Sequence, residues 1–357
     1  MTSNQQADAG RPPVVVLQSM RKGRAGTTYV DHMVDGAAPE VTVRLFSWAT
    51  ALLGEYDVVH LHWPEHMIRR RHPVKGALAA IGLVVLLLRA RRTGVPVVRT
   101  VHNLAPHQRV GPVLKALLAW ADRRTDAYIH LNAVTPARAG VRAVVIPHGH
   151  YRDRFAHHPQ GDATSGRLLH IGLIEPYKGL EVLLRCMHQS ARRDLSLRVV
   201  GLPKNDRART MVRDACAEDD RISSRLEFVS DAELVREVTQ AALVALPYRH
   251  MHNSGMVLVA LSLNRPVLVP RTPANEAIAE EVGPGWVLMY DGAFDVEALE
   301  SGLREAGGRR GGTPRLEGRD WATVGEQHYQ LYLEALRGRR GTSAQPRTRT
   351  PTRERVT

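Results

Sequence analysis

The sequence predicts an α/β protein made of two doubly wound parallel-sheet domains that face each other across a cleft. Short apolar segments typical of buried strands alternate with helical segments along most of the chain. A polar segment rich in turn-forming residues, 151–166, separates two such series and is predicted to be a linker. The length of 357 residues also favours two hydrophobic cores over one.

The first series predicts one domain over residues 13–150. Its strands are apolar nearly throughout, which is typical of parallel strands that are covered on both faces. We expect them at Pro13–Ser19, Val41–Ser47, Asp57–Trp63, Val95–Asn103, Ala127–Asn132 and Ala143–Gly149. Residues 1–12, which are polar and lack an apolar signal core, are predicted to be disordered.

The second series predicts a domain over residues 167–320, followed by a helix over 321–337. Asp231 is the expected N-cap of one helix in this domain. The basic segment 338–357 has little apolar content and is predicted to be a disordered tail. The expected strands are Arg167–Ile174, Leu195–Gly201, Arg225–Ser230, Ala242–Tyr248, Arg265–Arg271 and Gly285–Tyr290.

The composition favours an anionic partner in a reducing compartment. The formal net charge is +13, which suits nucleic acid, an anionic membrane or a phosphorylated small molecule. Nucleic acid is disfavoured, because aromatic residues make up only 5% and no known binding module is present. The two cysteines, Cys186 and Cys216, have no metal-type spacing, and we expect a cytoplasmic protein.

The longest apolar run, residues 76–88, is shorter than a bilayer-spanning helix requires. Basic residues flank it within the segment 69–92. Two interpretations stay open: a core helix, or a helix that lies on an anionic lipid surface with its arginines at the headgroups.

Polar residues that follow strands of the second domain predict a phosphate site. Ligands bind this fold class at the carboxyl ends of the strands. Lys178 follows the first strand, and Gly179 permits a tight turn into the next helix. After the fourth strand, Arg249 precedes the segment 253–255 (Asn253, Ser254, Gly255), which starts an apolar helix with free amides. The ammonium and this helix start together predict a clamp for a diphosphate.

In the first domain the strand ends carry glycines, histidines and a tryptophan. A glycine-bearing basic loop follows the first strand, Trp63 could stack on a sugar, and Glu65 or a histidine could accept a proton. A zinc site is disfavoured because no ligand spacing supports it. The candidate residues here are Gly23, Arg24, Gly26, Trp63, Glu65, His102, Asn103 and His107.

The order of the motifs resembles a glycosyltransferase of the GT-B type, with two Rossmann-like domains, and of the family 4-like (group 1) class. The resemblance covers most of residues 13–336 and is carried by "LHIGLIEPYKGLEVLL", "LRVVG", "LEFVSDAELVREVTQAALVALPY" and "SGMVLVALSLNRPVLVP". It implies a nucleotide diphosphate sugar donor whose phosphates contact Lys178. It also implies that Asn253, Ser254 and Gly255 lie at the phosphates and sugar, and that the first domain binds the acceptor. The base would lie near Gly201, Phe228, Val229 and Ser230.

Two departures from that family leave the stereochemical course open. Leu173 stands where the family usually has an arginine, and Met251 and Val259 stand where it has paired glutamates. An inverting transferase would need a base in the first domain, for which Asp31, Glu65 and His102 are the candidates.

We therefore expect a hexosyltransferase that moves a sugar to a lipid-linked or polysaccharide-precursor acceptor at the inner face of the plasma membrane. GDP-mannose is the favoured donor, and no cofactor, metal or nucleic-acid partner is expected. The alternatives are a nucleotide-sugar epimerase-like enzyme and an inactive GT-B protein.

Overall fold

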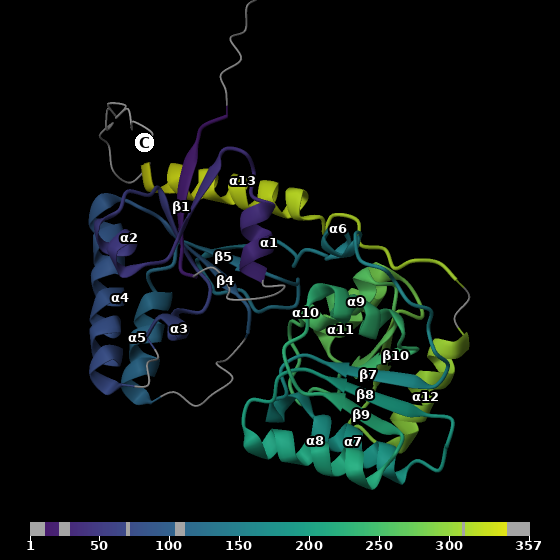
Figure 1. Ribbon diagram of the computed structural model, residues 1–357. Helices are drawn as coiled ribbons and strands as arrows, with labels where there is room; N and C mark the ends of the chain where they lie inside the picture. The colour runs from purple at the N-terminus through teal and green to yellow at the C-terminus, as the bar shows by residue number, and fades with distance from the viewer. Residues whose placement is uncertain (1–10, 21–28, 69–71, 104–110, 309–310, 341–357) are drawn as a thin grey trace, which may run out of the picture.

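A computed structural model of the chain describes residues 11–20, 29–68, 72–103, 111–308 and 311–340. They form two α/β domains, each built on a six-stranded sheet with helices packed on it (Figure 1). Every strand pair in both sheets is parallel. The predicted fold class is confirmed.

The N-terminal sheet has the strand order β2-β1-β3-β4-β5-β6, so the chain reverses direction across the sheet between β1 and β3. The interior strands β3 and β5 are buried at every position, as expected for parallel strands covered on both faces. The strands are β1 Val14–Gln18, β2 Val41–Leu45, β3 Val58–Leu61, β4 Val97–Val101, β5 Ala127–His130 and β6 Arg142–Val145.

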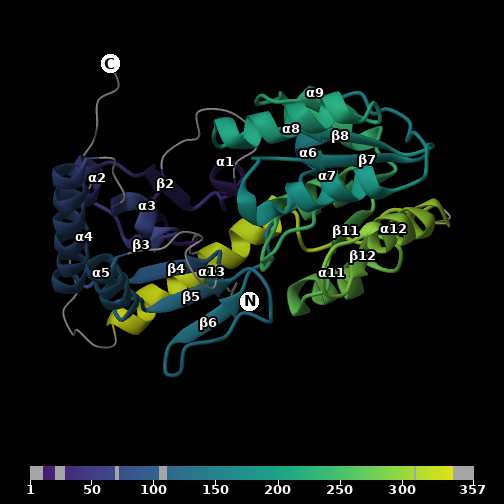
Figure 2. The ribbon, with the colours of Figure 1, turned by 90° about the horizontal axis from the view of Figure 1, so that it is seen from below.

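Helices pack on both faces of this sheet, and α4 is the longest of them. It ends at Gly94, which adopts a left-handed conformation with φ of 70°. Figures 1 and 2 both place α4 at the edge of the molecule that is remote from the C-terminal domain. The helices are α1 Tyr29–Asp35, α2 Trp48–Leu53, α3 Pro64–Ile68, α4 Pro73–Thr93 and α5 Pro112–Asp122.

The C-terminal sheet has the order β12-β11-β10-β7-β8-β9. Its first and fourth strands, β7 and β10, are neighbours, and the direction of winding reverses between them. The strands are β7 Arg167–Ile171, β8 Ser196–Val200, β9 Ile222–Arg225, β10 Leu243–Ala245, β11 Val267–Pro270 and β12 Val287–Tyr290. The helices are α6 Arg152–Phe155, α7 Leu180–Gln189, α8 Asp206–Glu218, α9 Asp231–Thr239, α10 Gly255–Ser262, α11 Pro273–Val282 and α12 Val296–Gly308.

Two local predictions in this domain are wrong. The third strand is Ile222–Arg225 and not Arg225–Ser230, because Ile222 is the buried residue that pairs with β8. The apolar residues that follow leave the sheet, and Phe228 is 56% exposed. The N-cap of α9 is Ser230 and not Asp231, since Ser230 and Glu233 form a reciprocal capping box.

The chain ends and the predicted linker take part in packing. Tyr151 and Phe155, at the start of the segment 151–166, belong to the core of the C-terminal domain. The last helix, α13 (Trp321–Arg340), returns to the N-terminal domain and packs against its sheet (Figure 1). Arg11 forms an ion pair with Glu326 of this helix, and the Pro12 carbonyl accepts a hydrogen bond from the Tyr329 hydroxyl. Residues 338–340 are the end of α13, so these parts of the predicted tails have regular contacts or structure. The rest of both predicted tails lies outside the described residues.

The chain crosses between the domains twice, and the two crossings are hydrogen-bonded to each other. The His150 N–H donates to the Arg319 carbonyl at 2.7 Å, and the Trp321 indole Nε1–H donates to the His150 carbonyl at 2.7 Å. Position 149 must be glycine, because a Cβ there would overlap the Trp321 ring. These contacts fix the segment that enters the cleft between the domains.

Candidate active site

A cavity of about 1250 Å³ lies between the two domains. The N-terminal domain lines it with residues that follow β3, β4 and β5, among them Trp63, His102 and Leu131. The C-terminal domain lines it with residues that follow β7, β8, β10 and β11. The cavity is therefore at the carboxyl ends of both sheets, where doubly wound folds bind ligands.

Lys178 provides a buried positive charge on the wall of this cavity. It ends a short 3₁₀ turn after β7, and Gly179 follows with φ of 68°, which brings the backbone against the Pro247 carbonyl. The side chain is only 7% exposed, and burial lowers the pKa of its ammonium group to about 8. Among the described residues no carboxylate forms an ion pair with it. An ammonium group that has lost water without gaining a counter-ion is suited to bind an anionic ligand.

The N-terminus of α10 lies on the wall of the same cavity. The helix follows β10, which is the neighbour of β7 across the point where the winding reverses. Ser254 is its N-cap, but its side chain makes no capping hydrogen bond, so the first-turn amides keep their capacity for a ligand. Lys178 and Gly255 both line the cavity, as the predicted clamp requires.

The loop between β10 and α10, residues 246–254, belongs to the C-terminal domain and is hydrogen-bonded to the N-terminal domain. Asn253 donates from Nδ2 to the His102 carbonyl at 2.9 Å, and its Oδ1 accepts from Asn132 at 2.8 Å. His252 Nε2 lies 2.8 Å from Thr135 Oγ1. Arg249 lines the cavity, but its guanidinium forms an ion pair with Glu181. The charge of Arg249 is thus partly neutralised, whereas Lys178 forms no ion pair with a carboxylate of the described residues.

Exposed apolar side chains form one end of the cavity. Leu173, Leu202 and Phe228 follow β7, β8 and β9, and they are 52%, 42% and 56% exposed. All three line the cavity, together with Gly201. Apolar surface of this kind is suited to the flat face of a heterocyclic base.

On the opposite wall, the ring of His102 stacks on Trp63 with a centroid distance of 3.6 Å. His102 Nε2 is hydrogen-bonded to His62 Nδ1 at 3.0 Å, and His62 Nε2 is hydrogen-bonded to Gln18 Oε1 at 2.8 Å. Burial lowers the pKa of His62 to about 3 and that of His102 well below its usual range. Both imidazoles are therefore neutral near pH 7.

The structure brings most of the predicted site residues to this one cavity. Glu65, Asp31 and Ser230 are described but do not line it; Glu65 lies on α3 and Asp31 on α1. Gly23, Arg24, Gly26 and His107 lie outside the described residues. The predicted residues that line the cavity are Trp63, His102, Asn103, Lys178, Gly201, Phe228, Val229, Arg249, Asn253, Ser254 and Gly255.

Several residues on the wall were not predicted. The aromatic ones among them are Tyr29, His148, Tyr151, Tyr177, Tyr248, His250 and His252. His148 follows β6, so the rule that directs attention to strand ends could have found it. His148 Nδ1 donates to the Gly149 carbonyl at 2.8 Å, and burial lowers its pKa to about 4. Tyr29 and Tyr151 lie outside any strand end, and no sequence signal marked them.

The described residues contain no group of three or more histidines, cysteines or carboxylates arranged to hold a metal ion. Of the carboxylates in the described part of the chain, Glu227 and Asp231 are the two on the wall of the cavity, and both belong to the C-terminal domain.

Two facing Rossmann-like domains, with a buried lysine and a helix N-terminus on one wall of the cavity and imidazoles on the other, are the architecture of the GT-B class of glycosyltransferases. A model for "Glycosyl transferases group 1" matches residues 165–305. Among solved structures, sucrose-phosphate synthase from Thermosynechococcus elongatus superposes with a TM-score of 0.61 at 14% identity, covering 92% of this chain and 100% of that one. Anabaena HepE in complex with UDP-glucose gives a TM-score of 0.61 at 14% identity, with coverage of 92% and 99%.

The sequence comparison is more specific. The chain is 49% identical over 340 residues to the GDP-mannose:glycolipid 4-beta-D-mannosyltransferase of Xanthomonas campestris pv. campestris, covering 94% of this chain and 96% of that protein. The chain therefore belongs to the glycosyltransferase family that contains this mannosyltransferase. It is a hexosyltransferase with the GT-B fold, as the sequence predicted.

Proposed function

We propose that this enzyme transfers mannose from GDP-mannose to a glycolipid acceptor and forms a β linkage. The similarity of 49% over nearly the whole chain to a GDP-mannose:glycolipid 4-beta-D-mannosyltransferase supports the donor, the acceptor class and the linkage together. The paired domains leave a cavity of about 1250 Å³, which suits a nucleotide sugar with part of an acceptor.

The observation that carries the proposal is the position of Lys178. Its buried ammonium group has no carboxylate partner among the described residues and shares a wall with the N-terminus of α10. Negative charge grows on the GDP β-phosphate as the bond to the sugar breaks. A fixed cation and free helix amides stabilise that charge more than they stabilise the bound substrate, and this lowers the barrier.

The apolar end of the cavity supports a position for the guanine base. Phe228 and Leu173 offer exposed faces beside Gly201, which has no side chain to obstruct a ligand. The base, the diphosphate and the sugar would then follow one another along the cavity, from β8 and β9 towards α10 and the N-terminal domain.

A β product from an α-linked donor requires inversion at the anomeric carbon, and inversion needs a base that takes the proton of the acceptor hydroxyl. Three candidates were predicted from the sequence. His102 is the one among them that lines the cavity, and it is neutral near pH 7, so we assign this role to His102. Trp63, stacked on His102, would contact the acceptor sugar.

We also propose that the enzyme works on the cytoplasmic face of an anionic membrane, with α4 in contact with the lipid. In the described part of the chain, α4 is the one helix whose length and hydropathy would be enough to cross a membrane. One face of α4 packs into the domain core through Leu83, Leu86 and Leu87. The outward face carries Val74, Leu78, Ile81, Val85 and Leu88, which are 41–62% exposed. We call these five residues the α4 apolar stripe.

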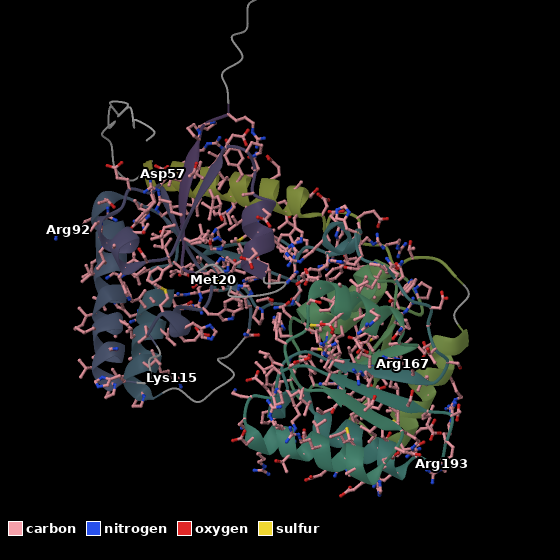
Figure 3. The ribbon with its side chains drawn as sticks, viewed as in Figure 1. Met20, Asp57, Arg92, Lys115, Arg167 and Arg193 are labelled. Atoms are coloured by element: carbon pink, nitrogen blue, oxygen red, sulfur yellow. The ribbon has the colours of Figure 1, made fainter. Side chains whose placement is uncertain are left out.

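Basic residues flank this stripe. Lys75 lies beside Val74 at its start, Arg91 and Arg92 follow it on the same helix, and Lys115 lies on the adjacent α5; all four are exposed. Figure 3 shows Arg92 and Lys115 on the outer side of the N-terminal domain. Apolar side chains in the acyl boundary with cations at the headgroups are the pattern of an interfacial helix. The basic residues 69–71 of the predicted lipid-binding segment lie outside the described residues.

The proposal is tested by incubating the purified enzyme with a panel of nucleotide sugars and with a glycolipid acceptor in vesicles that contain an anionic lipid. We expect transfer from GDP-mannose and a β-mannosyl product, with the configuration assigned by NMR. Transfer from a UDP-sugar but not from GDP-mannose would contradict the donor assignment. An α-linked product would contradict inversion.

A further inference from the structure

Three side chains from three different strands form a hydrogen-bonded chain that ends at the active-site cavity. Gln18 is the last residue of β1, His62 follows β3 and His102 follows β4. The distances are 2.8 Å from Gln18 Oε1 to His62 Nε2 and 3.0 Å from His62 Nδ1 to His102 Nε2. Gln18 and His62 are 1% and 2% exposed, so water does not compete for these bonds.

The hydrogen bonds that link Gln18, His62 and His102 determine which ring nitrogen of each histidine carries a proton. An amide oxygen only accepts, so His62 must carry its proton on Nε2. Because His62 is neutral, its Nδ1 is then an acceptor, and His102 must donate from Nε2. The lone pair of neutral His102 is consequently on Nδ1. That atom has no hydrogen-bond partner among the described residues, and the ring lines the cavity.

The orientation of the Gln18 amide is itself held by its surroundings. Its Nε2 donates to the Tyr332 hydroxyl at 3.4 Å and contacts Met33 Sδ at 3.8 Å. Tyr332 comes from α13, the helix that returns from the C-terminal domain. Trp63 covers one face of the His102 ring, and Asn253 holds the His102 carbonyl. The imidazole therefore has little freedom to rotate or to exchange its tautomer.

We propose that Gln18 and His62 are positioning residues that hold His102 in the tautomer with a free Nδ1, so that this nitrogen takes the proton of the acceptor hydroxyl. The inference rests on the function proposed above. In the step, the acceptor O–H bond breaks and its proton goes to His102 Nδ1. The acceptor oxygen forms a bond to the anomeric carbon, and the electron pair of the old bond leaves with the diphosphate.

The surroundings of His62 and His102 oppose a permanent positive charge on either ring. Both rings become cationic only at low pH, and the growing negative charge of the diphosphate offsets that cost during transfer. The titratable and charged groups that face His102 are His62, His148, Arg99 and His66, with Tyr29 against its ring; those that face His62 are His60 and His328.

The tautomers can be measured without activity. Nitrogen-15 spectra of histidine-labelled full-length protein near pH 7, assigned with His102→Gln and His62→Gln, report which ring nitrogen is protonated. We expect Nε2–H for both His62 and His102. A His102 that is protonated on Nδ1 would overturn the proposal. It would do so even if the enzyme transfers mannose from GDP-mannose, so the two failures can be told apart.

Kinetics of two Gln18 variants separate a positioning role from a structural one. Gln18→Leu frees the His62 tautomer, and we expect kcat to fall about 100-fold with donor affinity unchanged. Gln18→Glu places a carboxylate next to His62 and favours the protonated pair, so the acid limb of kcat/KM should move to higher pH by about one unit or more. His130→Gln is the matched control. His130 lies on β5, is 5% exposed and takes no part in the Gln18–His62–His102 hydrogen bonds, so this variant should leave the acid limb of kcat/KM in place.

An acid limb that does not move in Gln18→Glu would overturn the proposal. If either Gln18 variant fails to fold, as judged by thermal unfolding, the tautomer measurement on the wild-type protein still decides the question.

Discussion

The Asn253 side chain donates a hydrogen bond of 2.9 Å to the backbone carbonyl of His102, and this bond joins the two domains at the active site. Asn253 immediately precedes the N-cap of α10, and His102 immediately follows β4. The residue proposed as the base and the helix proposed to bind the leaving group are therefore one hydrogen bond apart. We expect this contact to couple closure of the two domains to assembly of the site.

Asn253→Ala should weaken that coupling. Loss of this partly buried hydrogen bond between the domains costs about 1–2 kcal/mol, so kcat/KM for transfer should fall roughly fivefold to thirtyfold. A looser closure also admits water, so the ratio of donor hydrolysis to transfer should rise. Radioactive GDP-mannose measures both products in one assay. Thr135→Val, which removes the neighbouring bonds to His252 and Asn132 but leaves the bond from Asn253 to the His102 carbonyl, is the matched control and should have a smaller effect. Unchanged hydrolysis in Asn253→Ala would argue against the coupling.

Lys178→Met should reduce affinity for the donor with little change in fold. A charge-assisted contact to the diphosphate contributes about 1.5–3 kcal/mol, which corresponds to a loss of about tenfold to a hundredfold in donor binding by calorimetry. Lys204→Met is the matched control, because Lys204 lies at the same edge of the sheet but forms an ion pair with Glu175. Donor affinity that is equal in Lys178→Met and the wild type would contradict the clamp.

The same lysine gives a signature in the pH dependence of stability. Burial lowers its pKa from 10.5 to about 8, so the folded protein releases this proton more easily than the unfolded chain does. Between about pH 8 and 10.5 the unfolded state binds more protons, and the contribution of Lys178 to the free energy of unfolding should rise with pH. Lys178→Met should lack this rise and should be more stable by about 2–4 kcal/mol at pH 7. Urea unfolding at pH 7, 8, 9 and 10 measures both effects, and identical slopes in the two proteins would contradict the assignment.

Replacing three residues of the α4 apolar stripe should release the enzyme from lipid. We expect Leu78→Ser, Ile81→Ser and Val85→Ser together to weaken binding to vesicles with an anionic lipid by about 3 kcal/mol, or about 100-fold. Val145→Ser, at a residue that is 49% exposed on β6, is the control. Turnover of a short, water-soluble acceptor should be unchanged in the triple variant, because the stripe is remote from the cavity. Full vesicle binding by the triple variant would exclude α4 as the lipid contact.

The two sheets, and the position of Lys178 and Gly255 on one cavity, could be predicted from the sequence because each depends on local patterns. Strands buried on both faces are apolar runs, and the rule that ligands bind at strand ends led directly to Lys178 and Gly255. The third strand of the second domain was misplaced because Leu226 and Phe228 are apolar for a reason other than the sheet. Phe228 faces the cavity, and an apolar pattern does not distinguish a core residue from one that meets a ligand.

The histidine-rich wall could be predicted only in part. His102 was found by its position after β4, but its partners are set by tertiary structure. Gln18 comes from β1 and Tyr332 from α13, which returns to the first domain only after the whole second domain has been traversed. No local signal in the sequence relates residues 18 and 332. The hydrogen bonds from Gln18 through His62 to His102 could therefore be identified only from the three-dimensional structure.

The buried histidines should make the protein sensitive to mild acid. Burial lowers the pKa of His62 to about 3, and those of His148, His170 and His328 to about 4. In the unfolded chain each would take up a proton near pH 6.5, so the unfolded state binds more protons between about pH 6.5 and 4. The free energy of unfolding should therefore fall as the pH is lowered through that window.

Each histidine lowers the free energy of unfolding by about 1.4 kcal/mol for every pH unit over which only the unfolded form is protonated. The free energy of unfolding should therefore fall steeply as the pH is lowered. Urea unfolding at half-unit steps from pH 7.5 to 4.5 measures it. His328→Leu removes one buried imidazole of α13 and should reduce the slope by about one proton, whereas His157→Leu, at an exposed position, should leave the slope unchanged. A free energy of unfolding that is constant down to pH 5 would mean that these histidines are solvated in the folded protein. The buried environment that we propose keeps His102 neutral would then not exist.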